Sequence, residues 1–124
     1  MERRALLCGL VALGMGAAGV AAAQTYPARP IKLIVPFVAG GPPDVIARIV
    51  ADAAGTRLGQ TVVVENRPGA GATIGTRAVA GTEADGYTLL FASTTSLSIA
   101  PALFKNVDYD PVRSFAPEIG RAHV

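Results

Sequence analysis

The stretch that decides the fold is residues 31–66, which read IKLIVPFVAGGPPDVIARIVADAAGTRLGQTVVVEN. Residues 31–35 are a β-branched run before a proline, and residues 61–66 are almost continuously apolar, as strands covered on both faces of a parallel sheet tend to be. Between them an apolar i, i+4 stripe predicts a helix that begins near Asp44, as N-cap or first-turn residue, and stops at Gly59. The stripe expected to face the sheet contains Val45, Ile46, Ile49, Val50, Ala53, Ala54 and Leu58.

The rest of the chain continues this alternation. Residues 73–80 predict a short helix with Ile74 and Ala78 facing inward, and residues 87–92 predict a third strand. Hydroxyl side chains at residues 93–96 are suited to cap a helical turn after that strand. The resulting βαβαβ order has connections long enough for right-handed crossovers. It predicts an α/β fold with an open, mainly parallel sheet and flanking helices.

A ligand is expected at the loops that follow these strands, because helix N-termini present unpaired N–H groups there. Residues 36–44 contain two adjacent glycines, residues 66–73 are glycine-rich, and residues 93–96 offer four hydroxyl groups. Each loop also has a purely structural interpretation: a tight turn with a capping aspartate, a change of chain direction, and a helix cap. The residues alone leave both interpretations open at each loop.

Composition excludes several classes of protein. The 124 residues are 51% hydrophobic with a mean hydropathy of +0.42, too apolar for a disordered tail and too short for two ordinary domains. Lys and Arg number 11 against 9 Asp and Glu, with no basic run, so no nucleic-acid partner is expected. The single cysteine, Cys8, and the single histidine, His123, predict neither an intramolecular disulfide nor a metal-ligand cluster.

Residues 1–23 have the pattern of a secretory signal peptide. A charged start with Arg3-Arg4 precedes the apolar residues 5–20, and three alanines before Gln24 suit signal peptidase. We therefore expect cleavage after Ala23 and export to the periplasm. A membrane anchor is the alternative, and the choice between the Sec and Tat routes stays open.

Enzyme interpretations are disfavoured by what surrounds the glycines. Gly69 and Gly71 are followed by Ile74 where a G-x-G-x-x-G fingerprint needs glycine, and the next predicted strand ends without an acid to hold a ribose. No Walker lysine follows any of the loops, and His123 is the only histidine, so a nucleophile has no obvious base. We expect neither an enzyme nor a cofactor.

Several long motifs lie in register over residues 26–117. They read YPxRPIxLIVPF from Tyr26, GGPxD from Gly40, LGQxVVVENRPGAG from Leu58, DGYTLL from Asp85 and YDPVRxFAP from Tyr109. In these motifs the chain resembles the periplasmic receptors of tripartite tricarboxylate transporters, the Bug-type solute-binding proteins. The resemblance implies a two-lobe periplasmic-binding-protein fold of type II. Such a receptor closes on a small di- or tricarboxylate or an amino acid and delivers it to membrane permease subunits.

The resemblance also implies which residues bind the ligand. The first two loops would contact its carboxylate, partly through ordered water, with the hydroxyl residues of the third loop beside them. Pro43 stands where the family commonly has a hydroxyl residue, and Ala72-Thr73 stands where Gly-Asn is common, so the ligand's identity is left open. The expected ligand-binding residues are Phe37, Ala39, Gly40, Gly41, Asp44, Gly71, Ala72, Thr73, Ser93, Thr94 and Thr95.

The family pattern stops after Pro117. Residues 118–124 read EIGRAHV, which the start of a widely used sequencing adapter can encode, so we expect a non-native tail there. Residues 24–117 are then expected to be a truncated N-terminal lobe that binds ligand weakly or not at all by itself. A nucleotide-binding α/β enzyme fragment and a stand-alone exported binding module remain the alternative functions.

Overall fold

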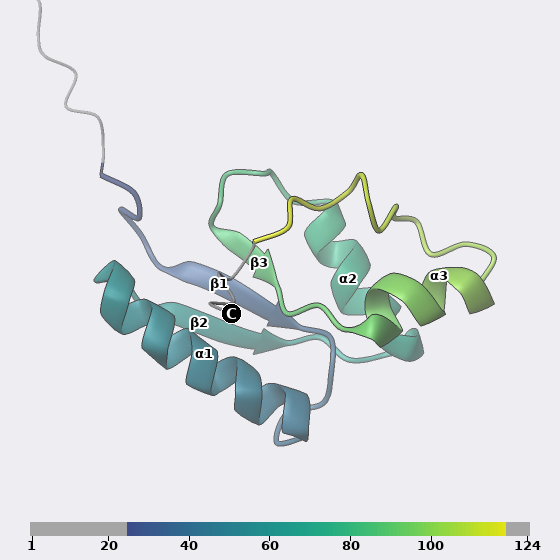
Figure 1. Cartoon of the computed structure of the whole chain (residues 1–124), viewed down its shortest axis with the longest axis horizontal. Coiled ribbons are helices and arrows are strands. Elements are labelled where there is room, and N and C mark those ends of the chain that lie inside the picture. Colours follow the sequence, from purple (N-terminus) through teal and green to yellow (C-terminus); the bar gives the residue numbers. More distant parts are fainter. Residues whose placement is uncertain (1–24, 119–124) are drawn as a thin grey trace, which may run out of the picture.

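The computed structural model describes residues 25–118, and three parallel strands form its centre (Figure 1). β1 (Ile31–Val35) lies between β2 (Val62–Asn66) and β3 (Thr88–Leu90), and both neighbours run parallel to it. The predicted α/β fold with a parallel sheet is therefore confirmed. The third strand is shorter than the predicted residues 87–92.

Five helical segments surround the sheet. The long helix α1 contacts β1 and β2, whereas α2 contacts β1 and β3 (Figure 1). Beyond β3 a short π-helical segment, η2, leads directly into α3. The segments are α1 (Pro42–Leu58), the 3-10 turn η1 (Ala70–Ala72), α2 (Thr73–Ala80), η2 (Thr95–Ile99) and α3 (Ala100–Leu103).

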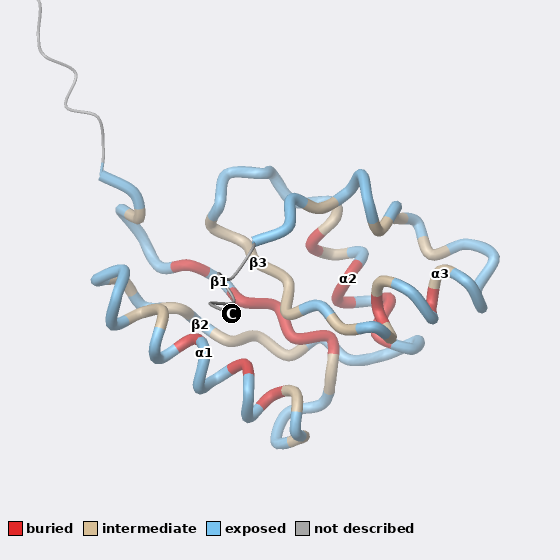
Figure 2. Tube along the Cα trace, viewed as in Figure 1, coloured by how far each residue is buried: buried red, intermediate tan, exposed pale blue. Residues whose placement is uncertain are grey.

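Burial is concentrated on the central strand and on the helix turns that face it (Figure 2). Leu33 and Val35 of β1 pack against Ala47 and Ala51 of α1 in one apolar cluster. Side chains alternate between the two faces of a strand, so Ile34 points to the opposite face, where α2 lies. The two helices thus cover opposite faces of β1.

The predicted inward stripe of α1 is wrong. Ala47 and Ala51 face the sheet, while Ile46 and Ile49 are 52% and 64% exposed. The small side chains let the helix lie close to β2. A methyl group added at Gly55 would lie 3.7 Å from the amide nitrogen of Val62 in β2 and 3.1 Å from the carbonyl oxygen of Gln60 in the preceding turn. Close packing of a small-residue face therefore decided the orientation, and the larger aliphatic side chains face away from the sheet.

The boundaries of α1 follow local chemistry. Gly41 is the N-cap, so Asp44 is a first-turn residue and the alternative of an Asp44 N-cap is wrong. Gly59 ends the helix in the left-handed conformation with φ of 66°, as predicted. An acidic side chain in the first turn interacts favourably with the partial positive charge of the helix N-terminus.

The predicted α2 is confirmed over residues 73–80, but its inward face is not the predicted one. Ile74 is 48% exposed, whereas Gly75, Thr76 and Val79 are buried. Gly75 allows no side chain, because a methyl group there would lie 2.8 Å from the carbonyl oxygen of Arg67. The face of α2 that contains Gly75 therefore packs inward, with Thr76 and Val79 buried beside it.

β2 also departs from expectation. It is an edge strand of the described sheet, and Val63 is 48% exposed, so its apolar run is not covered on both faces here.

The predicted signal peptide lies outside the described residues, as does nearly all of the predicted tail. Within residues 25–118, no helix has the length and the apolar character needed to cross a membrane.

Candidate functional site

The carboxyl ends of the three strands lie at one edge of the sheet, where η1 and η2 contact one another (Figure 1). The β1–α1 loop, the β2–α2 loop and the segment after β3 all leave from this edge. This is the edge at which open α/β sheets bind their ligands. The structure therefore brings the three predicted loops together.

The β1–α1 loop is held in place by the side chain of Asp44. One oxygen of this carboxylate, Oδ2, accepts hydrogen bonds from the amide of Gly40 at 2.8 Å and from Nε of Arg48 at 3.0 Å. The other oxygen, Oδ1, accepts one from Nδ2 of Asn66 at 2.9 Å. Asn66 Nδ2 also donates to the carbonyl oxygen of Phe37 at 3.1 Å, so the end of β2 supports the loop that follows β1.

These bonds stabilise the charged form of Asp44. The hydrogen bond from Arg48, followed by those from Gly40 and Asn66, lowers the pKa of the Asp44 carboxyl to about 2. The Asp44 side chain is only 4% exposed, and both of its oxygens are occupied by protein donors. Asp44 is therefore a buried, fully satisfied carboxylate at the start of α1.

The β2–α2 loop has an unusual backbone. Ala70, Gly71 and Ala72 have φ values of 44°, 63° and 71°, a left-handed conformation that costs a non-glycine residue roughly 1–2 kcal/mol. Two hydroxyls at the start of α2 fix this turn. Thr73 Oγ1 donates to the carbonyl oxygen of Ala70 at 2.8 Å, and Thr76 Oγ1 donates to that of Ala72 at 2.7 Å.

The third segment begins with a helix cap, as predicted. The Ser96 hydroxyl accepts a hydrogen bond from the Ser93 amide at 3.0 Å, and the Ser93 hydroxyl accepts one from the Ser96 amide at 3.3 Å. The Tyr109 hydroxyl donates to the carbonyl oxygen of Ser96, and burial raises the pKa of this phenol. The ring of Phe104, after α3, lies against Gly71 and connects this segment to the β2–α2 loop.

The expected ligand-binding residues differ in how accessible they are. Ala39, Gly40, Gly71 and Thr94 are exposed at the strand ends. Asp44, Ala72 and Thr73 are buried. The remaining expected residues are half-buried: Phe37, Gly41, Ser93 and Thr95.

Sequence reasoning assigned no role at this edge to the side chains of Arg48, Asn66 or Tyr109, although it placed Asn66 at the start of the second loop. Arg48 follows Asp44 by four residues, which is a helical neighbour position, so an ion pair was readable from the spacing. Asn66 is an uncharged polar residue at the end of β2, after three valines and Glu65, which is a weaker signal. Nothing in the local sequence links Tyr109 to Ser96, because the two residues meet only in the folded chain.

The chemistry of this edge favours backbone donors over charged side chains. The amide groups of Val38 and Ala39 donate to no other group within residues 25–118. Pro42 and Pro43 carry no N–H, so the first turn of α1 offers an anion fewer donors than a helix start ordinarily does. The groups best placed to bind a ligand oxygen are therefore the backbone amides of Val38 and Ala39 in the β1–α1 loop.

The cations near the strand ends already have partners. Arg48 is paired with Asp44, and Nε of Arg67 donates to Glu65 at 2.6 Å. The hydrogen bonds that Glu65 accepts from Arg67 and then Lys32 lower the pKa of this carboxyl. Among the described residues no group of three or more His, Cys, Asp and Glu side chains is placed to hold a metal ion.

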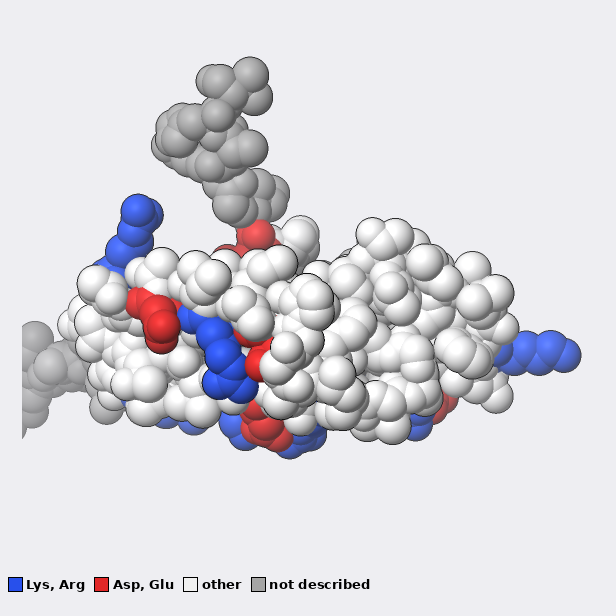
Figure 3. Space-filling model, turned by 90° about the horizontal axis from the view of Figure 1, so that it is seen from below, with Lys and Arg blue, Asp and Glu red and all other residues white. Residues whose placement is uncertain are grey.

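Surface charge does not mark a second site. On the face seen in Figure 3, acidic and basic side chains lie beside one another over the half that contains α1, while much of the other half is uncharged.

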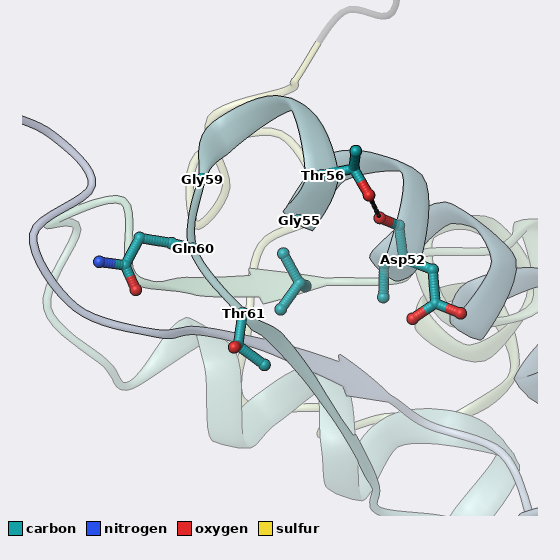
Figure 4. A pocket seen from close by; sticks show the side chains of 8 residues that line it. Asp52, Gly55, Thr56, Gly59, Gln60 and Thr61 are labelled. Atoms are coloured by element: carbon teal, nitrogen blue, oxygen red, sulfur yellow. Dashed lines mark hydrogen bonds between the residues drawn. The ribbon is translucent and has the colours of Figure 1, made fainter.

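A shallow, open hollow of about 400 Å³ lies between the end of α1 and the start of β2, lined by Asp52, Thr56 and Gln60 among others (Figure 4). It is at the opposite end of β2 from the loops, and Thr56 already donates to the carbonyl oxygen of Asp52 at 3.0 Å.

Comparison with known proteins gives one consistent result. The family described as "Tripartite tricarboxylate transporter family receptor" matches residues 46–120. Protein BugT of Bordetella pertussis is 44% identical over 118 residues, which are 94% of this chain and 36% of BugT. The chain thus spans about a third of the length of the curated relatives that it matches.

Solved structures share the fold of the matched part. The periplasmic binding protein BugD is 48% identical with a TM-score of 0.68, over 74% of this chain and 30% of BugD. MatC (Rpa3494) from Rhodopseudomonas palustris, with bound malate, is 37% identical with a TM-score of 0.71, over 74% of this chain and 31% of MatC. The described lobe is similar to part of a periplasmic binding protein.

Proposed function

Since this chain belongs to the tripartite tricarboxylate transporter receptor family, we propose that its lobe forms one side of an exported receptor's ligand cleft. The family is one of solute-binding receptors and not of enzymes. The ligand of this proposal is a small organic carboxylate, captured in the periplasm and delivered to the membrane permease subunits of the transporter. Cleavage of a signal peptide after Ala23 is part of the proposal.

One observation carries this function: within residues 25–118 the backbone N–H groups of Val38 and Ala39 have no protein partner, and they lie in a loop at the carboxyl edge of a parallel sheet. Such groups bind an anionic oxygen without a catalytic side chain. A carboxylate at a helix N-terminus gains only about 0.3–1 kcal/mol at an exposed position. Useful affinity therefore needs several donors together and the exclusion of water.

We assign the contacts as follows. The exposed backbone of Ala39 and Gly71 would approach the ligand most closely, with the half-buried ring of Phe37 beside it. Ser93, Thr94 and Thr95 would supply hydroxyl groups from the third strand end. Gly40, Gly41, Ala72 and Thr73 would shape the loops around the carboxylate.

A second lobe would complete the cleft. The relatives are about three times as long as the matched part, and closure of two lobes is the usual way in which binding proteins exclude water from a ligand. The lobe by itself then presents its donors to bulk water, which competes for every hydrogen bond. We propose that this chain alone binds ligand weakly or not at all.

A chimeric receptor tests the proposed function. Residues 25–118 would replace the matching segment of MatC, whose structure contains malate, and malate binding would be measured by isothermal titration calorimetry. We expect saturable binding by the chimera and none by the isolated chain. A cooperatively folded chimera that binds neither malate nor any of succinate, citrate and aspartate would contradict the proposal. Binding of NAD by the isolated chain would favour the enzyme alternative.

A further inference from the structure

Three side chains at the carboxyl edge are all bonded to one another. Arg48 and Asn66 each donate to Asp44, and a second nitrogen of Arg48 donates to Oδ1 of Asn66 at 3.2 Å. We call Asp44, Arg48 and Asn66 the carboxylate triad. Its members come from the first two turns of α1 and from the last residue of β2, so it joins the end of the β1–α1 loop to the start of the β2–α2 loop.

The carboxylate triad holds the β1–α1 loop at two backbone points. Asp44 accepts the amide hydrogen of Gly40, and Asn66 donates to the carbonyl oxygen of Phe37. Val38 and Ala39, whose amide groups have no protein partner among the described residues, lie between these two points. The two anchors therefore limit the conformations available to the peptide groups that would bind the ligand.

The same geometry removes Asp44 from direct contact with ligand. Both oxygens of its carboxylate accept hydrogen bonds from the protein, and the side chain is buried. Because the Asp44 side chain is only 4% exposed, the ammonium group of an amino acid could reach it only after the β1–α1 loop had moved. The Gly40 amide is likewise occupied and cannot bind an anion at the same time.

We propose, on the basis of the proposed function, that the carboxylate triad positions the β1–α1 loop for the ligand and does not itself contact the ligand. Arg48 offsets the buried negative charge of Asp44, which lies close to the loop where the anionic ligand would bind. Asn66, at the end of β2, holds Phe37 in place through the hydrogen bond to its carbonyl oxygen. The triad therefore affects affinity for every carboxylate equally, and it does not select amino acids over hydroxy acids.

Malate and aspartate separate positioning from contact, because they differ only in a hydroxyl and an ammonium group. In the chimera with MatC we would measure both affinities for the parent and for Asp44→Asn, with Asp52→Asn as the matched control on the exposed side of α1. We expect Asp44→Asn to lower the affinities for malate and for aspartate by the same factor, about tenfold or more. Both affinities would be measured at temperatures where parent and variant are fully folded. Asp52→Asn should leave both affinities within twofold.

Three results would overturn the proposal. Affinities unchanged by Asp44→Asn would show that the loop needs no such anchor. A loss confined to aspartate would mean that Asp44 contacts the ammonium group. Tighter binding of malate would mean that charge repulsion by Asp44 outweighs loop positioning.

A second measurement separates this proposal from the proposed function. In the 124-residue chain, hydrogen exchange of the Gly40 amide would be followed by NMR in the parent and in Asp44→Asn, with Asn66→Ala as the variant to use should Asp44→Asn not fold. We expect exchange at Gly40 to become at least about tenfold faster in either variant. If the parent chimera binds no ligand, the proposed function fails, and unchanged exchange at Gly40 would then contradict the positioning role as well.

Discussion

The two glycine-rich loops at the carboxyl edge keep their shapes by different means. In the β1–α1 loop, side chains fix the backbone: Asp44 holds Gly40, and Asn66 holds Phe37. In the β2–α2 loop, the backbone itself is unusual, with positive φ at four consecutive residues, 69–72. Hydroxyl groups from the first turns of α2 and the ring of Phe104 support it.

The two loops are therefore sensitive to different kinds of change. The first loop depends on a buried charge and its donors, so it responds to protonation and to the loss of polar groups. The second loop depends on residues that tolerate left-handed conformation, so it responds to backbone substitutions.

The largest effect is expected where the two loops meet. Gly75→Ala places a methyl group 2.8 Å from the carbonyl oxygen of Arg67 and 3.0 Å from Cβ of Pro36. We expect the free energy of unfolding to fall by about 2–3 kcal/mol, since backbone atoms cannot move aside. Urea denaturation measures this loss. Gly81→Ala, whose methyl group would meet nothing closer than 3.7 Å, is the control, and equal losses in both variants would contradict the packing argument.

Loss of one anchor of the first loop comes next. Asn66→Ala leaves the Phe37 carbonyl oxygen and one Asp44 oxygen without a donor, which should cost about 1–2 kcal/mol of unfolding free energy. Limited proteolysis should then cut within the β1–α1 loop and spare the β2–α2 loop. Asn106→Ala, at an exposed position after α3, serves as the control. Cleavage spread evenly over both loops would mean that they are not held independently.

The second loop should gain stability from glycine. Ala72→Gly removes the penalty of a left-handed alanine at φ of 71°, so we expect unfolding free energy to rise by about 1 kcal/mol. Ala78→Gly, in the ordinary helical interior of α2, should instead lower it by about 1 kcal/mol. Thermal melts of both variants would report the opposite signs. A loss of stability in Ala72→Gly would argue against backbone strain at this position.

The smallest effect is a local response to acid. The pKa of Asp44 is lowered from its ordinary 3.8 to about 2, so its contribution to stability is complete above pH 4 and is lost as pH falls through about 2. We expect the NMR shift of the Gly40 amide to titrate with a midpoint near this pKa, while the Thr73 amide, in the second loop, does not follow it. A Gly40 midpoint near 3.8 would show that the hydrogen bonds to Asp44 are absent in solution.

Much of the fold was predictable because its signals are local. The run at residues 31–35 is β1 as predicted, and Gly59 ends α1 because glycine adopts the left-handed conformation there without steric cost. The parallel arrangement followed from the βαβαβ order. The inward faces of α1 and α2 were predicted wrongly because both helices are apolar or small on more than one side, and periodicity does not rank two such faces.

The candidate site divides in the same way. The glycine-rich loops and their place at the strand ends were predictable from the order of elements and from the motifs. The support that Asn66 gives to the first loop was not, because Asn66 is far from Phe37 in sequence and meets it only after β1 and β2 pair. Likewise, the positive φ of Ala70 and Ala72 is not a preference of alanine, so the local sequence did not predict it.

The order of strands and helices, the C-terminal end of α1 and the motifs of the receptor family follow from the sequence alone, since each depends on residues close together in the chain. The tertiary structure alone decided which helix faces meet the sheet, which amide groups remain available to a ligand and which carboxylate is buried. These features depend on how closely small side chains let α1 and α2 approach the strands. They also depend on hydrogen bonds that form only when the ends of β1 and β2 lie side by side.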